Sequence, residues 1–283
     1  KFCHFCVVPY TRGPEYSRPF NQILDEAKYL ADNGAKEIIL LGQNVNAYDS
    51  EGYRLSDLIL NIEKISEIKR VRYTTSHPKD MTEDLIEVYK TSKKLMPLVH
   101  LPVQSGSNKI LKLMNRKHTI EEYLNIFYKL KEINPNIEFS SDFIISYPGE
   151  EDQDFKDTFN LIERVEFINS YSFIFSPRPG TVAENLELIE KKISIKRLEK
   201  IQNVLFENQI RKNKSLEGKV VDVLVENLTD DKNKAFGKSE YMTSVIFNGK
   251  KNDIGKIVQV RIKDSNRNTL FGEVITNSDQ NVA

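Results

Sequence analysis

The chain has 283 residues, which is enough for one large domain or for a large and a small one. Its 39% hydrophobic and 29% charged residues are typical of a soluble globular enzyme, and no apolar run of about 18 residues predicts a membrane span. Basic and acidic residues both number 41, so the net charge is zero and any nucleic-acid partner must be held by a local patch.

The first part of the chain alternates between short apolar runs and helical patterns. Gly34 is expected to end the first helix, Ser56 and Thr82 to cap the next two, and Thr119 with Glu122 to form a capping box. Near-continuous apolar strands between helices favour a parallel sheet covered by helices. Helices are predicted at 20–35, 55–66, 82–93, 119–134, 150–166 and 190–214, and strands at 37–42, 71–76, 97–106, 137–146 and 170–176.

Polar, glycine-rich or proline-rich residues follow each predicted strand. In barrel-like β/α folds the active site lies at that end of the strands, so these loops are expected to converge on a site. They are the segments 42–44, 76–78, 104–106, 148–150 and 178–180.

The pattern changes after residue 214. Short strands separated by Asn, Asp and Gly turns predict a small all-β barrel of about 65 residues. We therefore expect two domains, 1–214 and 215–283. The second contains ten basic and ten acidic residues, so it is neutral overall.

Both cysteines of the chain, Cys3 and Cys6, lie in its first six residues. So few cysteines favour a reducing, cytoplasmic compartment over a disulfide scaffold. A structural zinc site would need four ligands, and only four scattered histidines could supply the others. A redox pair would precede a helix, which Pro9 disfavours, and two incidental thiols remain an equal alternative.

The stretch CHFCVVPYTRGPEYSR resembles the radical S-adenosylmethionine (SAM) methylthiotransferases. Their cluster loop has the pattern C-x-x-x-C-x-aromatic-C, and Cys3, Phe5 and Cys6 match its last four positions. Ser146 departs from that family's usual glycine. Segments 40–48, 100–119, 140–150 and 170–181 are similar to the subgroup that modifies tRNA, the MiaB type, and the β-rich tail is similar to its TRAM domain.

The resemblance implies a partial (β/α) barrel of the radical SAM type followed by a small all-β TRAM barrel. It also implies that the first cluster cysteine, the first barrel strand and an N-terminal domain with a second 4Fe-4S cluster precede Lys1. We therefore expect the 283-residue chain to be truncated, to bind the cluster poorly and to be inactive alone.

The activity implied by the resemblance is addition of a methylthio group to C2 of N6-isopentenyladenosine next to the anticodon. That C–H bond is not acidic, so cofactors must supply a deoxyadenosyl radical: a 4Fe-4S cluster on three thiolates, with SAM on its open iron. The implied partners are tRNA and an electron donor of the flavodoxin or ferredoxin type, with no membrane.

No side chain is assigned a catalytic role, and the metal ligands are expected to be Cys3 and Cys6. Phe5 is expected to position adenine through its backbone, and Arg116 to pair with the SAM carboxylate. Each residue also has a structural alternative, such as a core aromatic, a turn or a paired buried acid. The remaining cofactor-binding candidates are Gln43 and Asn44 for the amino group and Gln104, Ser105 and Asp142 for the ribose.

RNA contacts are expected from arginines near the site and from basic residues of the tail, although a solvated mixed surface is an equal alternative for any one of them. The first group is Arg12, Arg18 and Arg178, and the second is Lys232, Lys234, Lys238, Arg261, Lys263 and Arg267. His77 and His100 are interpreted as structural residues.

Three rival functions remain open at this point. The same chemistry could act on threonylcarbamoyl-adenosine or on a ribosomal protein. The chain could instead be a non-catalytic RNA-binding protein, or a structural zinc module.

Overall fold

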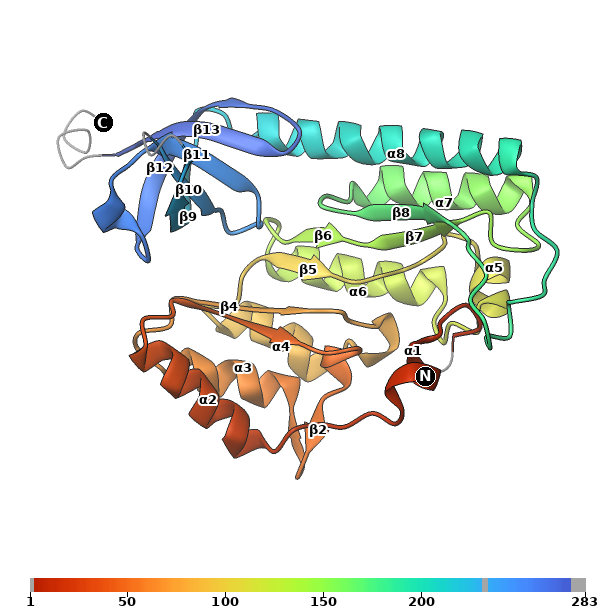
Figure 1. Cartoon of the computed structure of the whole chain (residues 1–283), viewed down its shortest axis with the longest axis horizontal. Coiled ribbons are helices and arrows are strands. Elements are labelled where there is room, and N and C mark those ends of the chain that lie inside the picture. The colour runs from red at the N-terminus through yellow and green to blue at the C-terminus, as the bar shows by residue number, and fades with distance from the viewer. Residues whose placement is uncertain (1–2, 231–233, 276–283) are drawn as a thin grey trace.

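The computed structural model describes residues 3–230 and 234–275. An α/β region is followed by one long helix and a small β-barrel (Figure 1). The helices are α1 (Val8–Arg12), α2 (Phe20–Asp32), α3 (Leu55–Glu63), α4 (Glu83–Thr91), α5 (Asn108–Leu113), α6 (Ile120–Ile133), α7 (Asp152–Val165) and α8 (Lys191–Lys214), with 3-10 turns η1 (Val45–Ala47), η2 (Pro78–Asp80) and η3 (Lys251–Asp253).

The strands of the α/β region are parallel and follow one another in chain order, apart from the short hairpin of β2 and β3. Hydrogen-bonded pairs are β1–β4, β5–β6 and β7–β8, and an isolated bridge from Val71 to Leu95 connects β4 with the segment before β5. The result is the expected open partial barrel. The strands are β1 (Glu37–Leu41), β2 (Asp49–Ser50), β3 (Tyr53–Arg54), β4 (Arg70–Thr74), β5 (Leu98–His100), β6 (Glu138–Ser140), β7 (Asp142–Ile145) and β8 (Tyr171–Ile174).

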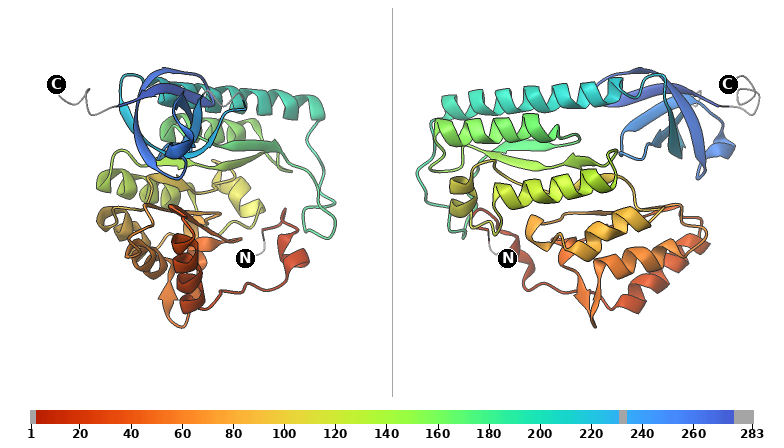
Figure 2. Two further views of the ribbon diagram at one scale, coloured as in Figure 1. Left: turned by 60° about the vertical axis from the view of Figure 1, so that its left-hand side comes forward. Right: turned by 180° about the vertical axis from the view of Figure 1, so that it is seen from behind.

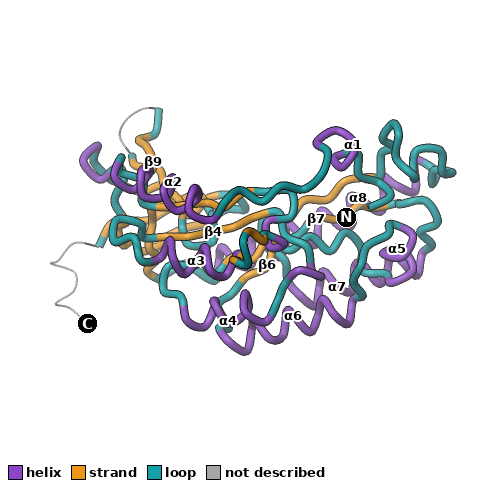
Figure 3. The backbone as a smooth tube through the Cα atoms, turned by 90° about the horizontal axis from the view of Figure 1, so that it is seen from below, coloured by secondary structure: helices purple, strands orange, loops and turns teal. Residues whose placement is uncertain are grey.

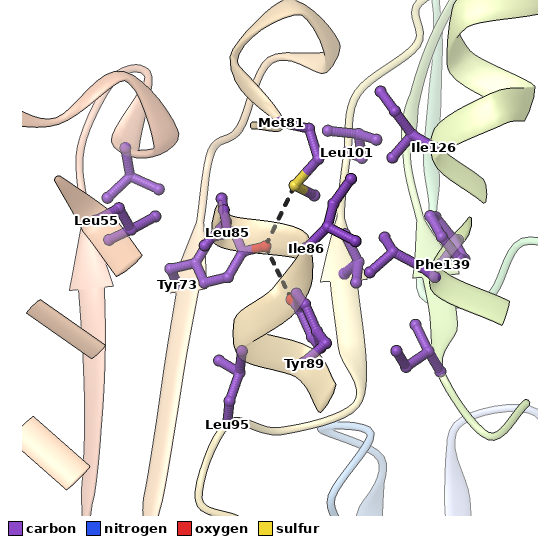
Figure 4. Close-up of a cluster of buried hydrophobic side chains, with 14 of the residues drawn as sticks. Leu55, Tyr73, Met81, Leu85, Ile86, Tyr89, Leu95, Leu101, Ile126 and Phe139 are labelled. Atoms are coloured by element: carbon purple, nitrogen blue, oxygen red, sulfur yellow. Dashed lines mark hydrogen bonds between the residues drawn. The ribbon is translucent and has the colours of Figure 1, made fainter. Parts of the chain in front are cut away.

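The core lies between these strands and the helices outside them. Figure 3 shows α3, α4, α6 and α7 along the outer side of the strands. Val71 and Tyr73 of β4 face the helices and are buried. Tyr89 of α4 donates a hydrogen bond of 2.9 Å to the Tyr73 hydroxyl, which lies 3.9 Å from the sulfur of Met81 (Figure 4). Alternate strand residues therefore face the helices, and the others face the inner side of the partial barrel.

The C-terminal part forms the predicted all-β barrel. Its strands close in the order β10-β11-β13-β12-β9 around a core that includes Val223, Val245 and Ile262. A Cβ on Gly237 would lie 2.3 Å from the Leu224 carbonyl oxygen, so only glycine permits this close approach of β10 to β9. The strands are β9 (Val220–Leu228), β10 (Ala235–Lys238), β11 (Ser244–Asn248), β12 (Ile257–Ser265) and β13 (Thr269–Val274).

Two arginines at the start of β4 join the β-barrel to the α/β region. Arg70 is 2% exposed and donates hydrogen bonds of 2.9 and 2.8 Å to the carbonyls of Lys238 and Asp222. The barrel therefore lies at the amino ends of the parallel strands, and the polar loops lie at the carboxyl ends. Figures 1 and 2 show the barrel and the N-terminus at opposite ends of the molecule.

Arg72 makes the second junction. Its guanidinium donates to the carbonyls of Glu240 and Ser239 at 2.7 and 3.1 Å, and its Nε donates to the Glu37 carboxylate at 3.0 Å. The sequence contains no pattern that identifies these buried charges. Both arginine side chains end on backbone oxygens of the barrel, so the barrel is held in one orientation.

Most predicted elements are confirmed, but some details are wrong. Ser56 does not cap α3: Arg54 is the cap residue, and the Ser56 hydroxyl donates to Asp84 at 2.6 Å. The expected strand 97–106 is shortened to β5, and the expected strand 137–146 is two strands broken at Ser141. Pro9 does not prevent a helix, because it stands in the first turn of α1, where its missing N–H costs nothing.

Helix α5 was not predicted. Ser107 caps this helix by accepting from the Ile110 N–H. Thr119 and Glu122 form the predicted capping box of α6.

Within the described residues, no helix combines the length and the apolar character needed to cross a bilayer.

Candidate functional site

The two cysteines stand on a tight loop at the carboxyl end of the partial barrel. The Cys6 N–H donates to the Cys3 carbonyl at 3.1 Å, which folds the loop back on itself. His4, between them, donates its N–H to the Met114 carbonyl and accepts from the Ala183 N–H, both at 3.0 Å. The loop is thus held between the end of α5 and the segment after β8, and both thiols are free and partly exposed.

Phe5 packs its ring into a small apolar cluster beneath the loop. The cluster includes Ile110, Met114, Tyr147 and Phe175, all buried. Phe5 itself is half-buried, and its side chain packs against this cluster. Of the two roles considered for Phe5, packing in an apolar cluster is observed, and positioning of adenine by its backbone stays a prediction.

Arg116 connects the cysteine loop to the end of β5. Its Nη1 lies 3.6 Å from the Cys3 sulfur, and its Nη2 donates to the Pro102 carbonyl at 2.7 Å. Its Nε is buried and finds no hydrogen-bond partner within residues 3–230 and 234–275. A fixed positive charge thus lies beside a sulfur that would be negative as a thiolate. Burial and the nearby Cys3 raise the pKa of Tyr147 to about 12, so that phenol stays neutral.

Three non-glycine residues that follow parallel strands have left-handed backbone conformations. Thr75 follows β4 with φ 68°, Gln104 follows β5 with φ 76°, and Ser146 follows β7 with φ 58°. Such conformations cost free energy in L-residues, most of all in a β-branched one, and they cluster at functional sites. Ser146 occupies the position where the resemblance leads us to expect glycine, and its backbone explains that expectation.

Asn44 and Gln43 follow β1 at the same end of the barrel. The Asn44 amide donates to an Asp80 carboxylate oxygen at 2.7 Å. Its Oδ1 is buried and has no hydrogen-bond partner in the described part of the chain, so one acceptor is available there. Gln43 is exposed. Nothing in the described geometry joins either residue directly to Cys3 or Arg116.

Gln104 and Ser105 differ in what surrounds them. Gln104 is 9% exposed, and its N–H donates to the Asp142 carbonyl at 3.0 Å. The Ser105 hydroxyl is 3.3 Å from that of Thr158 on α7 and accepts from the Ser107 N–H. Ser105 is 1% exposed, so this geometry gives its hydroxyl a packing role under α7 and argues against a contact with a ribose.

Asp142 begins β7 on the inner face and pairs with a histidine. His100 Nε2 lies 3.6 Å from an Asp142 carboxylate oxygen, and His100 Nδ1 lies 2.6 Å from the Ser140 hydroxyl. Sequence reasoning left His100 out of the site, because a histidine at a strand end is usually structural. His77 is structural as expected: its Nδ1 accepts from the Lys79 N–H and caps η2.

The arginines proposed near the site are all on the surface at the carboxyl end. Arg12 ends α1, Arg178 follows β8, and both are exposed. Arg18 pairs with Glu26 at 2.5 Å. Their side chains can therefore reach an anionic ligand outside the partial barrel.

The basic residues proposed in the tail are at the opposite end of the molecule. The Lys238 ammonium donates to the Ser244 hydroxyl at 2.9 Å, Arg261 donates to a backbone carbonyl at 3.3 Å, and Lys263 pairs with Glu273 at 3.4 Å. Lys234 is exposed, the Arg267 guanidinium lies 4.1 Å from the Phe206 ring centroid, and Lys232 is outside the described residues.

In the described part of the chain, no group of three or more His, Cys, Asp or Glu residues could hold a metal ion. The structure therefore supplies two thiols to any cluster at this loop, and it offers no complete zinc site within the described residues.

Comparison with known proteins agrees with this arrangement. The family model "Radical SAM superfamily" matches residues 1–162, and the model "TRAM domain" matches residues 214–275. The tRNA-2-methylthio-N(6)-dimethylallyladenosine synthase of Pelagibacter ubique is 69% identical over all of this chain, and that of Wolbachia pipientis is 51% identical over 96% of it. The chain spans 64% and 63% of those two proteins, less than two thirds of each.

Two solved structures share the fold at low sequence identity. Methylornithine synthase superposes with a TM-score of 0.52 at 12% identity over 73% of this chain and 59% of its own. Coproporphyrinogen III oxidase from Escherichia coli, described as a radical SAM enzyme, gives 0.51 at 12% identity over 99% of this chain and 70% of its own. Since the family model covers more than half of the chain and these folds agree, the chain belongs to the radical SAM superfamily.

Proposed function

We propose that the chain forms the radical SAM core and the TRAM domain of a tRNA methylthiotransferase, which adds a methylthio group to C2 of N6-isopentenyladenosine next to the anticodon. The observation that carries the proposal is the loop of Cys3 and Cys6, anchored at the carboxyl ends of the strands with Arg116 beside it. The relatives that bear this activity in their names are similar along nearly the whole chain.

The residues of the loop fit a 4Fe-4S cluster, with Cys3 and Cys6 as two of its thiolate ligands. Thiolates are the usual ligands of such clusters, and the arginine offsets part of their negative charge. When bound, the cluster and SAM supply a carbon-centred radical that can take hydrogen from an unactivated C–H bond. The packed Phe5 ring fixes the backbone between the two thiols.

The remaining polar groups at this end orient SAM. Arg116 has an unpaired buried Nε within the described residues and is proposed to bind its carboxylate. The Asn44 Oδ1 and the exposed Gln43 amide can accept from its ammonium. Gln104, held in a left-handed conformation after β5, is proposed to contact its ribose.

We also propose the division into a core, 1–214, and a TRAM barrel, 215–283. The substrate tRNA, an electron donor of the flavodoxin or ferredoxin type and a cytoplasmic location belong to the same proposal. Since the TRAM barrel lies at the end opposite the cysteines, tRNA must contact two distant faces to use both.

The test uses the full-length protein, reconstituted with iron and sulfide under anaerobic conditions. It is incubated with SAM, a reductant and tRNA that carries isopentenyladenosine, and the nucleosides are analysed by mass spectrometry. We expect methylthio-isopentenyladenosine and deoxyadenosine, both lost in Cys3→Ala and Cys6→Ala. If the methylthio product forms only on threonylcarbamoyl-adenosine tRNA or on a ribosomal protein, the proposed substrate is wrong.

A second measurement concerns the 283-residue chain alone. A complete cluster holds about four irons on three thiolates. Because this chain supplies two thiols, it should retain far fewer irons than that. A full complement of iron and sulfide on this chain would contradict the ligand assignment.

A further inference from the structure

The inner face of the partial barrel carries large apolar side chains that are exposed in the described part of the chain. Ile39 and Leu41 of β1 are 41% and 73% exposed, and Tyr171 and Phe173 of β8 are 63% and 57% exposed. On the outer face, Ile38 and Leu40 of β1 are buried, and Ser172 and Ile174 of β8 are half-buried. The exposure therefore follows the two-residue period of the strands and belongs to one face.

The two aromatic rings on β8 form a regular pair. Tyr171 and Phe173 have ring planes within 9° of parallel and centroids 6.5 Å apart. Their register partners on β7 are Asp142 and Ile144, so the rings lie next to these side chains on the same face. Two parallel, solvent-exposed rings offer aromatic faces on which a planar ligand can stack.

A polar pair lies beside the rings. The side chains of Asp142 and His100 are 33% and 21% exposed, so a ligand can reach both. The carboxylate accepts hydrogen bonds, and the imidazole can donate or accept one. We call His100, Asp142, Tyr171 and Phe173 the inner-face patch.

The inner-face patch continues toward the cysteine loop. Ile144, two residues beyond Asp142 on β7, packs against the same apolar cluster as Phe5. Phe5 lies between Cys3 and Cys6 in the sequence. A ligand on the patch would therefore lie along the path of β7 toward the proposed cluster.

We infer that the inner-face patch binds the target purine of the RNA, with Tyr171 and Phe173 stacking on its face and the His100–Asp142 pair bonding to its nitrogen edge. This inference rests on the proposed function. Unstacked bases of single-stranded RNA are recognised by aromatic stacking together with hydrogen bonds to their edges. An enzyme that acts on a ring carbon must take the base out of its stack, and a pocket of this chemistry receives it.

The test measures binding without catalysis. The reconstituted full-length protein is titrated, without reductant, into a fluorescent anticodon stem–loop that carries isopentenyladenosine, and into a matched RNA with an abasic site there. Tyr171→Ala/Phe173→Ala should weaken binding of the first RNA about 5- to 150-fold, the range for loss of one base stack. It should leave the abasic RNA unchanged. Asp142→Asn should weaken the first RNA by a smaller factor.

The matched control is Tyr29→Ala, a tyrosine that is 66% exposed on the outer helix α2 and should change neither RNA. Cluster absorbance and thermal unfolding verify that each variant is folded. If the double variant does not fold, Phe173→Leu is used in its place. Equal losses on both RNAs, or no loss on either, would overturn the inference. If wild-type enzyme modifies tRNA while the variants bind like wild type, only this inference fails; if wild type modifies no tRNA, the proposed function fails.

Discussion

Replacing Arg72 by methionine should destabilise the chain strongly, because this arginine joins the TRAM barrel to the α/β region. Its side chain is 7% exposed, and that of its partner Glu37 is 11% exposed. The change keeps the apolar stem but leaves a buried carboxylate and two carbonyls without their donor. Breaking a buried ion pair in this way costs about 3–5 kcal/mol, whereas an exposed pair contributes about 0–1 kcal/mol.

Denaturant unfolding of each variant measures this cost. Arg54→Met is the control, since Arg54 pairs with Asp84 at the surface, where the side chains are 61% and 38% exposed. The double variant Arg72→Met/Glu37→Leu should recover part of the loss, because no buried charge remains unpaired. A loss below about 1 kcal/mol for Arg72→Met, or a double variant that loses still more, would refute the reasoning.

Three further predictions concern Ser146, His118 and the tail residues Arg261 and Lys263. Ser146→Gly should raise the free energy of unfolding by about 1 kcal/mol, because it relieves a left-handed backbone and removes a buried hydroxyl without a partner in the described residues; an unchanged denaturant midpoint would contradict this. Burial lowers the pKa of His118 to about 3, with Arg116 adding to the effect. Between pH 6.5 and 3, the unfolded state therefore binds a proton at this histidine that the folded state does not bind. The free energy of unfolding of the wild type should fall by about 2 kcal/mol from pH 6.5 to pH 5, and that of His118→Leu should fall less steeply. Charge reversal at Arg261 and Lys263 should weaken tRNA binding and lower its salt dependence by about two phosphate contacts; an unchanged salt slope would argue against their role.

Much of the fold could be predicted because local patterns and tertiary structure agree. The capping box of Thr119 and Glu122 and the alternating strands of the C-terminal barrel are examples. The break at Ser141 could not be predicted from its apolar neighbours. Its hydroxyl accepts from the Val103 N–H at 2.9 Å, and its N–H donates to the Ser170 hydroxyl. Hydrogen bonds to side chains therefore take the place of backbone hydrogen bonds between strands at this residue.

The candidate site was only partly predictable. The spacing of Cys3 and Cys6 identified the loop, but the charge beside Cys3 depends on α5 and the turn after it, which bring Arg116 back to the loop. The pairing of His100 with Asp142 depends on which strands become neighbours. The position of the TRAM barrel depends on buried arginines that look like ordinary surface charges in the sequence.

The most direct test of the cysteine assignment is electron paramagnetic resonance of the reduced full-length protein, with deoxyadenosine measured in the same samples. If the assignment is right, Cys3→Ala and Cys6→Ala each lose the signal of one 4Fe-4S cluster, its perturbation by SAM, and deoxyadenosine formation. Variants that keep both the SAM-sensitive signal and deoxyadenosine formation would contradict it.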